Sequence, residues 1–142
     1  MGIAEESDLS LARYIWAFPN SLIGLAFVPI VGLSRGGLEI VDGVLELHGP
    51  FLDWVLRYCV PMHGGAAAIT FGHVVLGRDR ESLAQTRAHE RGHVRQYERW
   101  GPAFLPAYLL AAVWGFITGA GAYYGNVFER AAMKCEQFER HM

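Results

Sequence analysis

Two long stretches without a charged side chain dominate the hydrophobic pattern of the chain. The first covers residues 14–34 and the second residues 101–128, which is 21 and 28 positions respectively. Both exceed the roughly 18 residues at which an apolar segment becomes a candidate membrane helix. The first follows acidic residues and lacks the basic start of a signal peptide, so it predicts a retained membrane helix over residues 14–34. The alternative is a buried helix of a globular core.

Between these stretches, short runs of β-branched and apolar residues indicate strands. Residues 38–41 and 44–47 flank Asp42-Gly43, a dipeptide that favours a two-residue hairpin turn. This hairpin places Glu39 opposite Glu46, where like charges destabilise the pairing unless a cation or an arginine lies beside them. We expect solvent, the simpler explanation, to shield the two charges.

Three further elements follow along the chain. Residues 51–58 predict a short helix, and residues 68–76 predict a single strand because they are rich in β-branched and aromatic side chains. Residues 81–100 contain no proline and many helix formers, which predicts a long helix. Ser82 stands three residues before Gln85, the spacing of a capping box at the start of a helix.

These elements predict an α+β fold that is mainly helical. A helix bundle is combined with a small antiparallel β element, made of the hairpin 38–47 and the strand 68–76. We expect one domain over residues 1–142, because the chain is short for two cores. Its parts are a candidate membrane helix (14–34), a β-rich part (36–80) and a helical part (81–142).

Composition narrows the function classes. The chain of 142 residues is 52% hydrophobic and 18% charged, against roughly a quarter charged in ordinary soluble domains, which excludes a disordered chain. A net charge of −2 argues against nucleic-acid binding. The two cysteines, Cys59 and Cys135, are too far apart in sequence to signal a cysteine zinc site or a disulfide framework.

The predicted helix 81–100 carries the sequence His-Glu-Arg-Gly-His, with histidines at positions 89 and 93. Residues four apart lie on one face of a helix, about 6 Å from each other, so His89 and His93 can bind one metal ion. Glu90 lies beside them, where a carboxylate can accept a proton from a metal-bound water. Zinc lowers the pKa of such a water to about 7, which makes hydroxide available near neutral pH.

The motif and its surroundings resemble small gluzincin-type zinc metallopeptidases of bacteria. The similarity covers about residues 66–140 and rests on the segment 68–78, followed by Ala-His-Glu-Arg-Gly-His-Val-Arg-Gln at 88–96. The resemblance implies a strand along the cleft, a helix carrying the motif, and a third metal ligand within a Glu-Arg-x-Ala pattern. Residues 126–132 match that pattern, which makes Glu129 the implied third ligand. The long uncharged connection to Glu129 departs from the family.

The length of this connection limits how Glu129 can reach the metal. If one helix over residues 102–124 crossed a membrane completely, Glu129 would emerge on the opposite side from His93. We therefore expect this helix to lie alongside the motif helix, with a reversal near residues 119–121 and a last helix that begins near Asn126. The spacing of Asn126 and Glu129 also fits a capping box, so Glu129 is a ligand, a helix cap, or each in a different state of the protein.

Two other residues are candidates for contact with substrate or with an oxyanion. His73 lies in the predicted strand 68–76, where the alternative is a histidine that is simply hydrogen-bonded. Tyr97 lies one turn after His93 on the same helix face, and Tyr123 or Tyr124 offers a phenol near Glu129.

Arginines recur every four residues on another face of the motif helix, at positions 87, 91, 95 and 99. Like charges at this spacing repel, so a compensating partner is expected. Anionic lipid headgroups are one such partner, and acidic side chains of the protein are the other.

The sequence therefore predicts a membrane-associated zinc metallopeptidase with His89, His93 and Glu129 as metal ligands and Glu90 as the general base. Peptides or membrane proteins are its expected substrates, membrane lipids its expected surroundings, and a bacterial cell membrane its expected location. No nucleic-acid partner is expected. The alternatives are a non-catalytic membrane scaffold that zinc stabilises, and a membrane protein without metal.

Overall fold

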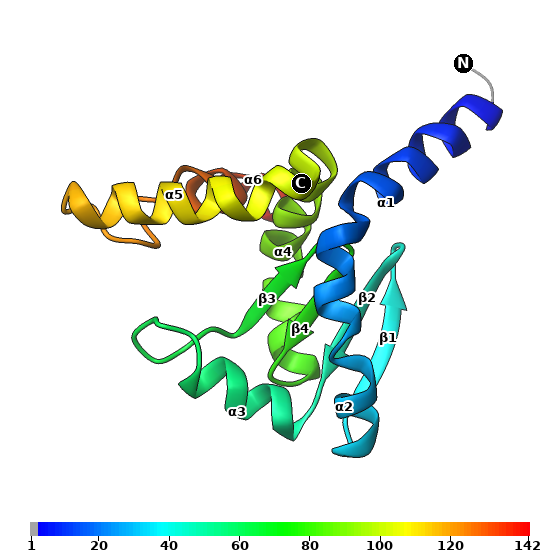
Figure 1. The fold of residues 1–142 in the computed structure, drawn as a ribbon, viewed down its shortest axis with the longest axis horizontal. Coiled ribbons are helices and arrows are strands. Elements are labelled where there is room, and N and C mark those ends of the chain that lie inside the picture. The colour runs from blue at the N-terminus through cyan, green and yellow to red at the C-terminus, as the bar shows by residue number, and fades with distance from the viewer. Residues whose placement is uncertain (1–2) are drawn as a thin grey trace.

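The structure, a computed structural model, describes the backbone of residues 3–142 and the side chains of residues 11–142. Within this part of the chain, helices predominate and one small sheet accompanies them, which confirms the α+β, mainly helical class (Figure 1). The helices are α1 (Ile3–Leu25), α2 (Val28–Leu33), α3 (Pro50–Tyr58), α4 (Arg80–Trp100), the 3-10 turn η1 (Gly101–Ala103), α5 (Phe104–Ile117) and α6 (Val127–Arg140). The strands are β1 (Gly37–Val41), β2 (Val44–His48), β3 (Ala68–Phe71) and β4 (Val74–Gly77).

The four strands form one mixed sheet in the order β1-β2-β4-β3. The predicted hairpin is confirmed, since β1 and β2 are antiparallel with Val41 opposite Val44. The sheet as a whole is not antiparallel, however, because β2 and β4 run parallel after the crossover through α3. β3 pairs only with β4 and therefore lies at an edge of the sheet.

The prediction of a single strand over residues 68–76 was wrong. β3 and β4 are two antiparallel strands joined by a tight turn at Gly72 and His73. Gly72 has a φ of 62°, a left-handed conformation that glycine adopts without strain. A Cβ atom there would lie 2.6 Å from the backbone nitrogen of Ser21, so only glycine lets the turn approach α1 this closely.

The sheet lies between α4 on one face and α1, α2 and α3 on the other (Figure 1). Because side chains alternate along a strand, each strand contributes to both faces. The core on the α4 side contains Val44, Val75, Leu83 and Val94. The core on the opposite side contains Val31, Leu47, Leu52, Val74 and Leu76.

In the expected Glu39–Glu46 pair, arginine side chains and not solvent neutralise the charge of Glu46. Glu46 is buried on the α4 side of the sheet and receives hydrogen bonds from Arg87 at 2.9 and 3.0 Å and from Arg91 at 2.9 Å. Our expectation that solvent shields both charges was therefore wrong for Glu46, whereas Glu39 is exposed. The arginine repeat of α4 faces the sheet at these two positions, so an acidic side chain and not lipid is their partner.

The predicted return of the chain after α4 is confirmed, but α5 does not run alongside α4. Figure 1 shows α5 projecting away from the sheet, and α6 returning towards α4. α6 makes the close helix pair with α4, where Gly92 faces Ala132. A Cβ atom on Gly92 would lie 3.1 Å from the Ala132 Cα, so the glycine allows the two helix backbones to approach.

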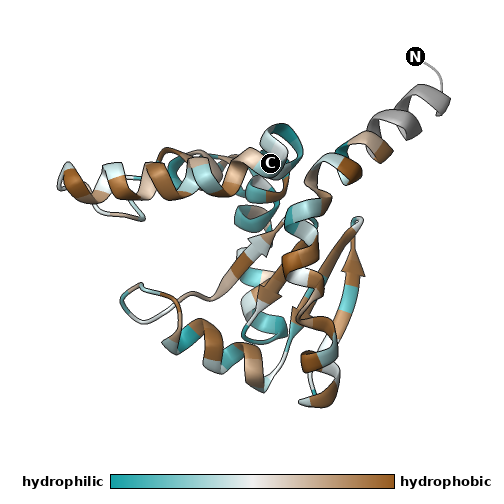
Figure 2. Cartoon of the chain, in the orientation of Figure 1, coloured by the Kyte–Doolittle hydropathy of each residue, from teal (hydrophilic) through white to brown (hydrophobic). Residues whose placement is uncertain are grey.

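Two helical segments are long and apolar enough to cross a membrane, namely Leu11–Leu33 and Arg80–Ile117. Only 28% of the most apolar 18-residue window in the first segment is buried within the protein, and 17% of that in the second. The core helix of a soluble domain, by contrast, is mostly buried. Figure 2 shows apolar residues along both α1 and α5. The exposed apolar side chains of α5 are Leu109, Leu110, Val113, Trp114, Phe116 and Ile117.

Candidate metal centre

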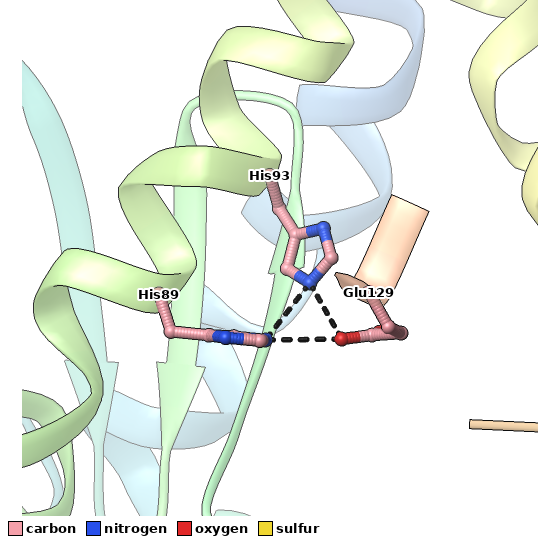
Figure 3. Close-up of side chains that lie close together, drawn as sticks. All are labelled: His89, His93 and Glu129. Atoms are coloured by element: carbon pink, nitrogen blue, oxygen red, sulfur yellow. Dashed lines mark hydrogen bonds and ion pairs between the residues drawn. The ribbon is translucent and has the colours of Figure 1, made fainter. Parts of the chain in front are cut away.

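Three side chains from two helices converge to form the candidate metal centre (Figure 3). Nε2 of His89 lies 3.2 Å from Nε2 of His93, and Oε2 of Glu129 lies 3.0 Å and 3.2 Å from these two nitrogens. Ligands at about 2.0 Å from a tetrahedral metal ion are roughly 3.3 Å apart. The triangle therefore has the size that one small divalent ion requires.

Local structure explains why Glu129 reaches the histidines. His89 and His93 lie one turn apart on α4, and Gly92 between them allows α6 to approach. α6 begins directly after Asn126, whose side chain accepts a hydrogen bond from the amide of Phe128 at 2.9 Å. Glu129 thus lies in the first turn of α6, as the fold-back prediction required.

The alternative role of Glu129 as a helix cap does not fit this geometry. The capping box needs the Glu129 carboxylate at the backbone amide of Asn126. That amide instead donates to the carbonyl of Tyr123 at 3.1 Å, while the carboxylate faces the histidines. The Asn126 side chain alone caps the helix.

Gln96 fixes the orientation of His93. Its amide nitrogen donates to the carbonyl of Phe128 at 2.9 Å, so its amide oxygen is left to face Nδ1 of His93, also at 2.9 Å. Nδ1 must then carry the proton, which leaves the lone pair of Nε2 free to bind a metal. Gln96 was not predicted as a site residue, although it belongs to the Val-Arg-Gln that follows the motif.

Carboxylate and phenol groups support the other two ligands. Oε2 of Glu136 lies 3.7 Å from Nδ1 of His89, an ion-pair distance that favours a proton on that nitrogen. The hydroxyl of Tyr108 donates to Oε1 of Glu129, which leaves Oε2 for the metal. Tyr108 was missed because a tyrosine within an apolar stretch gives no signal of which polar group it meets.

The electrostatics of the triangle require a positive charge at its centre. Burial disfavours the charged form of Glu129, but hydrogen bonds with His89 and His93 outweigh burial and hold the pKa of Glu129 far below its usual value. Glu129 is therefore a carboxylate. Two imidazole lone pairs and a carboxylate oxygen at about 3 Å repel one another unless a proton or a metal cation lies between them. This donor set fits a metal ion.

Glu90 lies next to the triangle without belonging to it. It is 5% exposed, and the hydroxyl of Thr70 on β3 donates to its Oε2 at 2.5 Å. Glu90, the two histidines and Glu129 all line one cavity of about 680 Å³. One carboxylate oxygen is thus held by Thr70, and the other remains available for proton transfer at the cavity wall.

The cavity is bounded by β3, α4, α5, α6, the loop between α5 and α6, and the segment 60–67 that precedes β3. Most of its lining is apolar, including Ile69 and Phe71 of β3 and Leu105 and Leu109 of α5. The edge strand β3 therefore runs along one wall, and α5 forms another. One side of α5 lines the cavity, and apolar side chains are exposed on the other side.

Tyr97 and His73, the candidates for substrate or oxyanion contact, lie in different places. Tyr97 lines the cavity, but its hydroxyl already donates to the carbonyl of Thr70 at 2.9 Å. His73 is not among the residues that line this cavity. Its ring stacks on Tyr14 at 4.1 Å between centroids, and its Nε2 lies 2.8 Å from Oε1 of Glu98.

No family model, no curated protein and no solved structure matches this chain.

Proposed function

We propose that the chain is a membrane-associated, zinc-dependent peptidase. The observation that carries the proposal is the convergence of His89, His93 and Glu129 at ligand spacing, with Glu90 on the same cavity wall. Two histidines, one carboxylate and an open fourth position are the donor set of catalytic zinc sites. A zinc ion held there lowers the pKa of a coordinated water to about 7 and polarises a carbonyl group.

The residues of the chain supply the remaining steps. Glu90 accepts the proton of the attacking water and delivers it to the leaving amine, because its carboxylate lies beside the ligands. Thr70 holds one oxygen of Glu90, so the carboxylate keeps its orientation during this transfer. Gln96 and Tyr108 hold His93 and Glu129 in the geometry that binds the metal.

The substrate segment binds in an extended conformation along β3. An edge strand offers unpaired backbone groups, and β3 is the edge strand that borders the cavity. The Thr70 carbonyl is the exception, because it already accepts from Tyr97. Thr70 lies on this strand and touches Glu90, so a peptide paired with β3 passes directly in front of the general base. The apolar cavity wall favours a segment with large apolar side chains.

Access to the cavity is from the membrane side. α5 is uncharged and apolar on all sides, lines the cavity with one face and exposes Leu110, Val113 and Trp114 on another. A helix of this composition is stable when lipid covers its outer face. Membrane proteins or their juxtamembrane segments are therefore the proposed substrates, with a bacterial cell membrane as the location.

The full chain, purified in detergent, tests the metal first. Wild type is expected to hold one zinc per chain, and His89→Ala is expected to lose it, while His141→Gln at the exposed C-terminal end retains it. If His89→Ala retains one zinc per chain, the assigned ligand set is wrong.

Glu90→Gln then separates an enzyme from a scaffold. This variant should retain zinc and lose cleavage of a peptide that wild type cleaves, since an amide cannot accept the proton. Undiminished cleavage would contradict the role of Glu90. A wild-type protein that binds zinc and unfolds at higher temperature with it, yet cleaves no membrane-anchored peptide, would support the alternative of a zinc-stabilised membrane scaffold.

A further inference from the structure

The loop between α5 and α6 brings a third polar group to the metal centre. Gly119 and Gly121 in this loop have φ values of 81° and 93°, which glycine adopts without strain. The amide of Gly121 donates to the carbonyl of Gly115, and that of Gly125 donates to the carbonyl of Gly121. These bonds fold the loop back over the cavity, which Tyr123 lines.

Tyr123 lies against the ligand triangle. Its hydroxyl oxygen is 3.5 Å from Nε2 of His89, the atom that faces the metal position, and the two rings stack with centroids 6.5 Å apart. The spacing is close to the roughly 3.3 Å that separates neighbouring ligands of a tetrahedral ion. The other three donor atoms show the same spacing, at 3.0 to 3.2 Å.

We propose that Tyr123 provides the fourth donor to the metal in the resting protein. The inference rests on the proposed metal centre and adds a regulatory feature to it. With Tyr123 bound, four protein side chains surround the ion, an arrangement typical of structural rather than catalytic sites. Substrate or water reaches the fourth position only after the phenol has left it. The centre is therefore closed by its own loop.

The neighbouring tyrosines do not have this geometry. Tyr97 donates to the carbonyl of Thr70, and Tyr108 donates to Oε1 of Glu129, on the side of the carboxylate away from the histidines. Tyr124, the next residue in the loop, is 73% exposed. Tyr124 thus provides a matched control within the same loop.

The loop has open space at two of its glycines. No atom lies within 4 Å of a Cβ built on Gly119 or Gly121, whereas Gly125 packs against Gly115 and Gly121. Glu129 belongs to α6, which packs closely on α4. The ligand triangle therefore stays in place when the loop moves, and only the fourth donor is removable.

Copper(II) provides a test that does not depend on activity, because it binds nitrogen and oxygen sites more tightly than zinc does. The full chain in detergent is freed of metal with a chelator and loaded with one copper(II) ion. A tyrosine oxygen bound to copper(II) produces a charge-transfer absorption in the visible range. We expect this band in wild type and in Tyr124→Phe, and its loss in Tyr123→Phe.

Zinc affinity gives a second measurement on the same variants. Tyr123→Phe should bind zinc on the order of tenfold more weakly in competition with a chelator, because one donor is missing. Tyr124→Phe should match wild type. A copper band that survives in Tyr123→Phe, or bound copper without any band in wild type, overturns the assignment of Tyr123. Failure to bind either metal would contradict the metal centre itself.

Discussion

Gln96 is the residue that couples the two helices of the metal centre. Its side chain accepts from Nδ1 of His93 and donates to the carbonyl of Phe128, the residue before Glu129. One amide group therefore sets the protonation of one ligand and the position of another. Groups of this kind commonly change metal affinity 10- to 100-fold when they are replaced.

Replacing Gln96 separates these two contacts. Gln96→Leu removes both hydrogen bonds and should weaken zinc binding by roughly 10- to 100-fold. Gln96→Glu keeps an acceptor for Nδ1 of His93 but loses the donor to Phe128, so we expect an intermediate loss. Chelator competition measures both affinities. Equal affinity in wild type and Gln96→Leu would contradict the role of Gln96.

Glu46 makes stability depend on pH. Burial opposes its charge, but hydrogen bonds and charges from Arg87 and Arg91 outweigh burial and lower its pKa below the usual value of 4.5. The stabilisation is therefore fully present above about pH 4.5, where the unfolded chain is also ionised, and it is lost as the pH falls through the lowered pKa.

Glu46→Gln tests this dependence. The variant should unfold more easily at pH 7, by about 3 kcal/mol, because two arginines lose their charged partner on a buried face. Its stability should also fall less than that of wild type between pH 5 and pH 3. Denaturant unfolding in detergent measures both. Glu39→Gln, on the exposed strand β1, is the control and should leave both quantities nearly unchanged.

Among individual residues, the sequence predicted which ones lie at the candidate site better than it predicted their contacts. His89, Glu90 and His93 follow from helical spacing, and the resemblance implied Glu129. The partner of Glu46 was not predictable, because Arg87 is 41 residues away in sequence and meets Glu46 only after α4 packs on the sheet. The same reason hides Tyr108, which is 21 residues from Glu129.

The pairing of α4 with α6 is the element-level feature on which the metal centre depends. The two helices are in close contact at Gly92, where a Cβ atom would lie 3.1 Å from the Cα and 3.2 Å from the Cβ of Ala132. Glu129 lies one turn before Ala132 on the same helix. A larger side chain at Gly92 must push α6 away, and Glu129 must move with it.

Gly92→Leu should therefore weaken zinc binding by at least about tenfold and lower the unfolding temperature, because overpacking costs about 1–3 kcal/mol. The matched control is Gly32→Leu in α2, where no atom lies within 4 Å of a built Cβ. If both variants bind zinc as wild type does, the close helix contact does not position Glu129.

Most elements were predictable because their signals are local. The Asp42-Gly43 turn and the proline-free motif helix are examples of such signals. The start of α4 was predicted less well, since Asp79 and not the expected capping box caps it, accepting from the amide of Ser82 at 2.7 Å. The direction of α5 had no local signal, because a helix that is apolar on all sides does not indicate which side packs on α4.

At the scale of the whole molecule, exposed apolar residues are concentrated on α1 and α5. Both helices extend beyond the sheet (Figure 1), and apolar residues follow both of them (Figure 2). Many of these apolar side chains are exposed. Contiguous exposed apolar surface of this kind marks a site that lipid or a partner covers. Lipid agrees with the absence of charge over residues 101–128.

The double variant Leu110→Glu and Trp114→Glu tests membrane contact. An acidic side chain in the apolar interior of a membrane costs on the order of 3 kcal/mol. In a flotation assay in which wild type floats with liposomes, most of the variant protein should therefore remain unbound. Phe138→Glu, an equally exposed position on α6, should float as wild type does. Equal flotation of the double variant would contradict lipid contact along α5.

The contacts of α1 with the rest of the chain have a consequence for synthesis. The amide of Asn20, buried within α1, donates to the carbonyl of Gly101 at 2.8 Å, and these two residues are 81 positions apart. A growing chain presents its N-terminal helix first. The ribosome must therefore add about 80 residues before Asn20 finds its partner. Until then, the part of α1 that later packs on η1 is free, and a chaperone or the insertion machinery has time to bind it.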